Sequence, residues 1–171
     1  MGTRVTQSKT SHPVPQSTFP TGHWEHIATY LKEGLIIIDR DKKIAFFNAA
    51  AESLTGVAQT QVYGATYNLV FRDNSWVTSL VNRAQNSGNS RTAEEGDLRD
   101  RNQCVIPVRI TCSPIFDKDN CSLGFVLVLH DLSYQKELEE EKLRDERLAA
   151  LRILAAGLAH EIKNPLAGMR G

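Results

Sequence analysis

The stretch from Leu132 to Leu166 constrains the fold of this chain more than any other segment. It holds no proline before Pro165 and a single glycine, Gly157, and strong helix formers dominate it. Such a composition lets a helix run without interruption, because no residue removes a backbone donor or favours a turn. Residues 137–147 are mostly charged, with both signs mixed, which is typical of a solvated helical face. The stretch therefore predicts one long helix.

An apolar seam occupies the second half of this helix. Its members follow spacings of three and four, and they are Leu148, Leu151, Ala155, Leu158 and Ile162. A lone helix cannot bury such a seam, so we expect a homodimer held by a parallel coiled coil. Charged residues occupy the seam positions further toward the N-terminus, where leucines instead recur every eleven residues, at 132, 143 and 154. The helix is therefore expected to change register between its two halves.

The residues before the helix alternate between strand and helix patterns. A β-branched run at 35–38 and a short strand at 43–48 flank a polar turn, which predicts a hairpin. The other expected elements are helices at 24–32, 49–55 and 75–85, short helical turns within 57–74, an exposed or edge strand at 91–98, and strands at 104–112 and 123–129. This order predicts an α+β domain over residues 23–131, with an antiparallel sheet and helices on one face.

The three cysteines suggest neither a disulfide framework nor a zinc site. They are Cys104, Cys112 and Cys121, an odd number without a CxxC pair, and a reducing, cytoplasmic compartment fits them best. Cys104 and Cys112 share the alternation of the strand at 104–112. We therefore expect both to be small core residues without a redox or metal role.

Composition excludes several other classes of protein. The 20 basic and 20 acidic residues cancel, which argues against a broad nucleic-acid surface. No apolar run approaches the ~20 residues that a membrane-spanning helix needs, so no membrane segment is expected in this chain. Residues 1–22 are rich in Ser, Thr, Pro and Gln, and we expect a disordered tail, because they cannot bury enough surface to offset the ordering entropy.

In element order and length, residues 23–131 resemble a PAS domain. The resemblance rests on the opening strand Gly34–Asp39, the passage Phe47–Glu52, and the last strand running into Asp131, Leu132 and Ser133. The Asp131 carboxylate can cap the backbone N–H of Ser133 or Tyr134 and so fix where strand stops and helix begins. The PAS ligand stays unknown, since no cysteine fits a flavin photosensor and residues 64–88 hold no histidine for haem.

The segment His160–Leu166 carries the most informative chemistry of the chain. The seam residues Leu158 and Ile162 each lie two positions from His160. At about 100° per residue, this places His160 on the opposite side of the helix, where a core histidine would not lie. Its imidazole is therefore expected to project into water, with Asn164 one turn later on the same face.

This segment closely resembles the phosphoacceptor box of two-component sensor histidine kinases. The fuller stretch Leu158–Gly171 resembles their nitrogen-regulation (NtrB-like) branch. The resemblance implies that His160 is the phosphoacceptor and Glu161 the general base that takes its proton. It implies that Asn164 orients a water in members that act as phosphatases. A zinc-protease helix is not expected, because that site needs histidine at position 164.

The resemblance also implies the rest of the system. With ATP and Mg, the full-length protein would autophosphorylate His160 and pass the phosphoryl group to an aspartate of a response regulator receiver domain. This chain lacks a glycine-rich nucleotide motif. We expect it to be the N-terminal part of the kinase, without bound cofactor or metal and inactive alone. Residues 132–147 would form the linker helix, and residues 148–171 the truncated first helix of the dimerisation and phosphotransfer domain.

A second hypothesis belongs to a different class. The PAS domain and the coiled coil could form a non-catalytic module that dimerises and binds a partner, with His160 never phosphorylated. A nucleotide-binding domain encoded downstream in the same reading frame would decide for the kinase.

Overall fold

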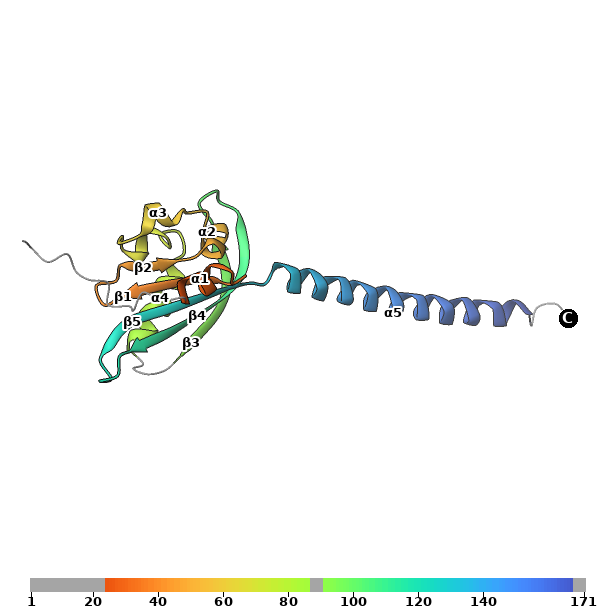
Figure 1. Ribbon diagram of the computed structural model, residues 1–171. Helices are drawn as coiled ribbons and strands as arrows, with labels where there is room; N and C mark the ends of the chain where they lie inside the picture. The colour runs from red at the N-terminus through yellow and green to blue at the C-terminus, as the bar shows by residue number, and fades with distance from the viewer. Residues whose placement is uncertain (1–23, 87–90, 168–171) are drawn as a thin grey trace, which may run out of the picture.

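The computed structural model describes residues 24–86 and 91–167 and shows an α+β domain from which one long helix extends (Figure 1). Five strands form a single antiparallel sheet in the order β2-β1-β5-β4-β3. The elements in chain order are α1 (Trp24–Thr29), β1 (Gly34–Asp39), β2 (Ile44–Phe47), α2 (Ala49–Thr55), α3 (Gln59–Val62), the 3₁₀ helix η1 (Tyr67–Leu69), α4 (Ser75–Asn86), β3 (Thr92–Arg99), β4 (Val105–Phe116), β5 (Ser122–Asp131) and α5 (Ser133–Ala167). The sheet, its accompanying helices and the long final helix confirm the predicted fold class.

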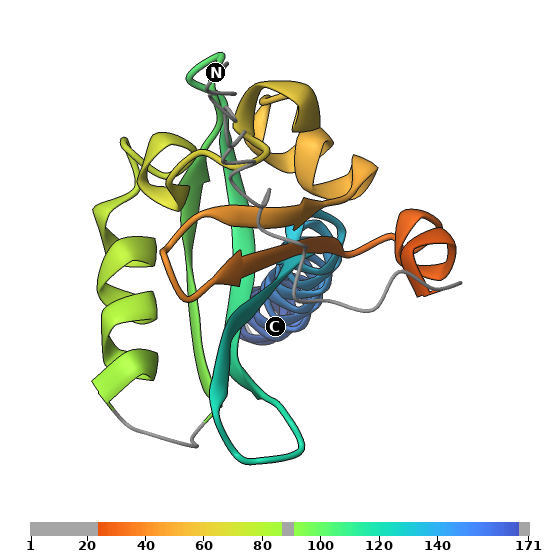
Figure 2. The same cartoon turned by 60° about the vertical axis from the view of Figure 1, so that its left-hand side comes forward.

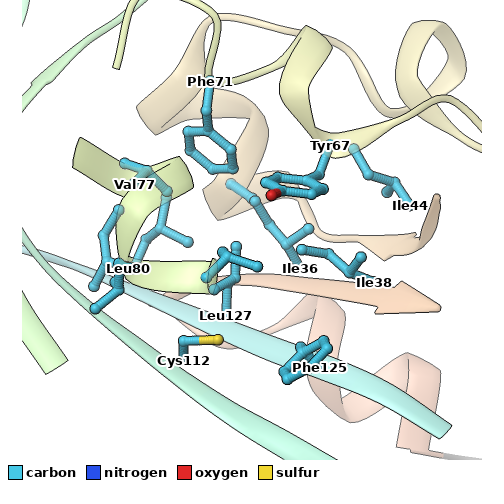
Figure 3. Close-up of a cluster of buried hydrophobic side chains, with 14 of the residues drawn as sticks. Ile36, Ile38, Ile44, Tyr67, Phe71, Val77, Leu80, Cys112, Phe125 and Leu127 are labelled. Carbon is cyan, nitrogen blue, oxygen red and sulfur yellow. The ribbon is translucent and has the colours of Figure 1, made fainter. Parts of the chain in front are cut away.

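One face of the sheet carries the hydrophobic core. Because side chains alternate along a strand, Ile36 and Ile38 of β1 point to the same face and pair with Leu127 and Phe125 of β5. Figure 3 shows these four side chains with Tyr67 of η1 above them. α4 contacts β3 and β4, and α2 contacts β1, which closes the core. The apolar stripe expected on α4 is its buried face, formed by Val77, Leu80, Val81 and Ala84.

Asn48 ties the beginning of the domain together. Its side chain is 3% exposed. The Oδ1 atom accepts the N–H groups of Leu35 at 2.8 Å and Ala51 at 3.0 Å, and Nδ2 donates to the carbonyls of Ala28 at 2.9 Å and Glu33 at 3.0 Å. The amide thus caps α2 and joins it to α1 and β1. Its burial leaves no amide hydrogen unpaired, which is the condition for burying a polar group at low cost.

Three tight turns of the sheet repeat the same chemistry. They begin at Asp39, Asp100 and Asp117. In each, the N–H four residues later donates to the aspartate Oδ1, at 2.8, 2.7 and 2.8 Å. The residue just before that donor is left-handed, with φ of 63°, 66° and 61° at Lys42, Gln103 and Asn120. The aspartate side chain supplies a local acceptor, which lets these turns close without glycine.

The prediction for Cys104 was wrong. β4 begins at Val105, and Cys104 is an exposed residue that closes the Asp100 turn by donating its N–H to that carboxylate. The alternation itself was predicted correctly, since Val108 and Cys112 are buried on the core face. Period-two patterning shows which face a residue shares, but it does not show where the turn ends and the strand starts.

The polar strand β3 lies at the edge of the sheet, as expected. Asn74 accepts the N–H of Arg99 and donates to its carbonyl, both at 2.8 Å. The indole of Trp76 donates to the carbonyl of Asp97 at 3.1 Å. These side chains occupy hydrogen-bonding positions that another strand would use, which protects the edge from pairing with a second chain.

Candidate functional site

α5 carries the predicted phosphoacceptor segment near its end. His160, Glu161 and Asn164 all have helical backbone, and the helix continues past Pro165 to Ala167. Positions 160 and 164 therefore lie one turn apart on the same side of α5, with position 161 about 100° around the axis. The orientation of these side chains, and residues 168–171, lie outside what the structure describes.

The surface of α5 is exposed along its described side chains, from Ser133 to Leu158. The charged stretch 137–147 is solvent-facing, as expected. The seam residues Leu148, Leu151 and Leu158 are also exposed, by 44%, 60% and 60%. Leaving apolar surface in water costs roughly 25 cal/mol per Å². In this single chain, the helix with the predicted phosphoacceptor segment therefore also presents an apolar seam that no described residue covers.

The junction between sheet and helix is built around Leu132. This residue is 3% exposed. Its N–H donates to the carbonyl of Pro107 on β4 at 2.8 Å, and its carbonyl accepts the N–H of Lys136 at 2.9 Å. Asp131 Oδ1 accepts the N–H of Ser133 at 2.8 Å, which confirms the predicted cap. Leu132 is therefore held by the last strand pairing and by the first turn of α5 at once, which fixes the direction in which α5 leaves the domain.

Ionisable side chains form a row across the sheet beside this junction. Arg109 Nε donates to Glu95 at 2.8 Å, and Arg109 pairs in register with His130. His130 Nδ1 lies 3.5 Å from the carboxylate of Glu33. All four side chains are about half exposed. Exposed ion pairs contribute little to stability, so this row marks a polar border of the sheet.

Tyr67 and Cys112 are the titratable residues within the described hydrophobic core cluster (Figure 3). Burial raises the pKa of the Tyr67 hydroxyl, and the neighbouring Cys112 thiol adds to the effect. Burial also raises the pKa of Cys112 to about 12. The thiolate is the reactive form of cysteine, so Cys112 is an inert core residue near neutral pH, as expected.

The part of the chain that the structure describes shows neither a cluster of metal-ligating side chains nor a helix that could span a membrane. Among the side chains that the structure describes, in 25–86 and 91–158, no three His, Cys, Asp or Glu residues are grouped to hold a metal ion. Among the described helices, none combines the length and apolar character that a bilayer crossing requires.

The sequence did not predict the structural positions of two junction residues. Leu132 was assigned to a helical leucine pattern, whereas it is buried at the edge of the domain. Pro107 went unremarked inside the predicted strand at 104–112. A proline within a strand is uncommon and usually marks an edge, a bulge or an end of pairing, so the signal was present in the sequence.

Comparison with known proteins places this arrangement among sensory proteins. The family model described as the PAS fold matches residues 22–132. The chain is 34% identical over 139 residues to the signal transduction histidine-protein kinase AtoS of Escherichia coli (strain K12), covering 81% of this chain and 22% of AtoS. It is 28% identical over 141 residues to the sensory histidine kinase/phosphatase NtrB of Proteus hauseri, covering 82% of this chain and 39% of NtrB. The chain therefore spans well under half the length of these relatives.

Solved structures share the fold at lower identity. A PAS domain from Colwellia psychrerythraea superposes with a TM-score of 0.55 at 21% identity, covering 66% of this chain and 96% of that one. The PAS domain of BvgS from Bordetella pertussis gives a TM-score of 0.56 at 17% identity, covering 74% and 95%.

Proposed function

This chain belongs to the PAS family, and on that premise we propose that it is the sensory and phosphoacceptor part of a two-component histidine kinase of the NtrB-like branch. The observation that carries the proposal is continuity: α5 starts at the capped end of the PAS domain and runs unbroken through His160. The similarity to AtoS and NtrB supports it, because both are named as histidine kinases. Residues 23–131 sense, 132–147 link, and 148–171 begin the dimerisation and phosphotransfer domain.

The chemistry uses the imidazole of His160 as a nucleophile. One imidazole nitrogen attacks the γ-phosphorus of ATP, and the bond from phosphorus to the ADP oxygen breaks. The other nitrogen carries a proton, and its hydrogen bond to the Glu161 carboxylate favours the reactive tautomer; the carboxylate then accepts this proton as the bond to phosphorus forms. ATP and Mg are supplied by a nucleotide-binding domain outside this chain. The phosphoryl group then passes to an aspartate of a response regulator.

Signal transmission uses α5 of two chains. The exposed seam at Leu148, Leu151 and Leu158 pairs with its copy in a parallel coiled coil. A change in the PAS domain rotates this helix pair and alters the access of the kinase domain to His160. Asn164 orients the water that removes phosphate from the response regulator, in keeping with the name kinase/phosphatase that NtrB carries.

The test is a pair of radiolabel time courses with the full-length protein. His160→Gln abolishes autophosphorylation, and Glu161→Gln slows it by a factor on the order of 10² to 10⁴, as expected for loss of a general base. Asn164→Ala keeps autophosphorylation and impairs dephosphorylation of the regulator. Label on another residue in the His160→Gln protein would contradict the proposal. A dimer that takes up no label at all would favour a non-catalytic binding module.

A further inference from the structure

The pairing of β4 with β5 stops at an unusual place. The register runs to Val108 opposite Asp131, so Pro107 and Leu132 face each other at the next position. Facing residues in an antiparallel ladder exchange two hydrogen bonds at alternate positions. Leu132 makes one of these bonds, because its N–H donates to the Pro107 carbonyl at 2.8 Å. The reciprocal bond cannot form, because proline has no N–H.

The carbonyl of Leu132 is therefore left for the helix. It accepts the N–H of Lys136 at 2.9 Å, which is the first helical hydrogen bond of α5. Leu132 is thus bonded to β4 through its N–H and to the first turn of α5 through its carbonyl. We propose that Pro107 is the positioning residue that ends the β4–β5 ladder and thereby sets the residue at which α5 begins. An N–H at position 107 would compete with Lys136 for the same carbonyl.

The consequence for signalling rests on the proposed function, whereas the positioning is a property of this chain alone. A start shifted by one residue turns every later side chain by about 100° around the helix axis. In the kinase, Pro107 would thus set the direction of His160 from the far end of α5.

The same strand supplies a matched control. Pro114 is also half-buried in β4, and it faces Phe125 of β5. The backbone N–H and C=O groups of successive residues point to opposite sides of a strand. Positions 107 and 114 are an odd number of residues apart, so the nitrogen at 114 points toward the β3 side, whereas the nitrogen at 107 points toward β5. The ladder between β3 and β4 covers positions 105–112 of β4, so position 114 lies outside it. An N–H restored at 114 would not approach the junction.

Residue-resolved amide exchange on this chain tests the proposal. In Pro107→Ala, the Lys136 amide exchanges at least ten-fold faster than in the wild type, and the new amide at 107 is protected. In Pro114→Ala, the Lys136 amide keeps its rate. The buried strand residue Leu129 keeps its rate in both variants, which separates repositioning from a general loss of stability. An ester-linked lactic acid at 107, which lacks the N–H and the ring, restores the protection of Lys136.

Two results would overturn the proposal. One is a Lys136 amide in Pro107→Ala that exchanges at the wild-type rate, and the other is an equal effect from Pro114→Ala. If Pro107→Ala does not fold, the lactic acid variant decides, because the proposal requires wild-type protection of Lys136 there. The kinase proposal fails by a different measurement, if wild-type full-length protein takes up no label at His160. That result would leave the amide exchange rates of this chain unchanged.

Discussion

Burial separates the cysteines of this chain into two kinds. Cys112 is fully buried, and desolvation raises its pKa to about 12. Cys104 and Cys121 are exposed, each at the closing position of an aspartate turn. Since reaction with alkylating reagents requires an accessible thiolate, the same residue type is expected to behave differently at these positions.

Alkylation of the native chain checks this difference. At pH 8, iodoacetamide should modify Cys104 and Cys121 and spare Cys112, whereas all three react in denaturant, as peptide mass spectrometry would report. The pH dependence has a definite sign. Between about pH 9 and pH 12, the unfolded chain releases the Cys112 proton and the folded chain retains it, so the free energy of unfolding falls as pH rises. Native labelling of Cys112 at the rate of Cys121 would contradict its burial.

At the residue scale, the sequence pattern predicts which strand residues share the buried face but not most of the individual hydrogen bonds that residues form. Cys112 was placed in the core correctly, because alternation governs it. Cys104 has the same phase, but the Asp100 carboxylate holds it in a turn, and periodicity carries no information about that bond. The cap that Asn48 places on Ala51 is local, but its bond to Ala28 and the role of Asn74 depend on backbone groups distant in sequence, so no local pattern reveals these. The roles of Glu161 and Asn164 stay predictions, because they rest on resemblance.

At the scale of elements, periodic segments were predicted with their approximate bounds, whereas the irregular stretch 57–74 was predicted correctly as short helical turns but without their positions. The stripe of α4 and the capped helix α2, which ends at Gly56 with φ of 69°, appear where expected. The sequence predicted short helical turns within residues 57–74, and α3 and η1 are two such elements. Their positions follow from contacts with β2, such as the bridge between Ile44 and Tyr63, which arise only once the sheet has formed.

The seam of α5 yields a prediction with an internal control. Leu158→Asp should shift the chain from dimer toward monomer in sedimentation experiments, because a charge replaces an apolar seam position. Ile153→Asp should leave the association unchanged. Ile153 is 73% exposed, but it lies about 200° around the helix from the seam residue Leu151. Two outcomes would show that the seam is not the dimer interface. One is a wild-type chain that stays monomeric at high micromolar concentration, and the other is an equal effect of the two variants.

At the scale of the whole molecule, the Asp131 carboxylate lies at the junction of domain and helix, where it accepts the N–H of Ser133, and we predict that it couples the two. Asp131→Ala should cost about 1 kcal/mol, the usual value for a lost helix cap, and leave the PAS domain folded. The full-length variant should keep basal autophosphorylation but lose its response to signal, because the junction no longer fixes α5. Asp131→Asn should retain both, since asparagine caps as well as aspartate. A normal response of the alanine variant, with wild-type stability, would show that the cap plays no part in coupling.

The length of α5 decides what kind of measurement can detect signalling. Position 160 follows Ser133 by 27 residues, so it lies roughly 40 Å along the axis from the domain at 1.5 Å per residue. A one-residue change in where the helix begins would move that position by only about 1.5 Å along the axis, yet it would swing its direction by about 100°. A spectroscopic measurement of distance along α5 would therefore record almost no change. A probe of orientation attached near the end of the helix would record a large change, because the proposed signal is a rotation of the helix.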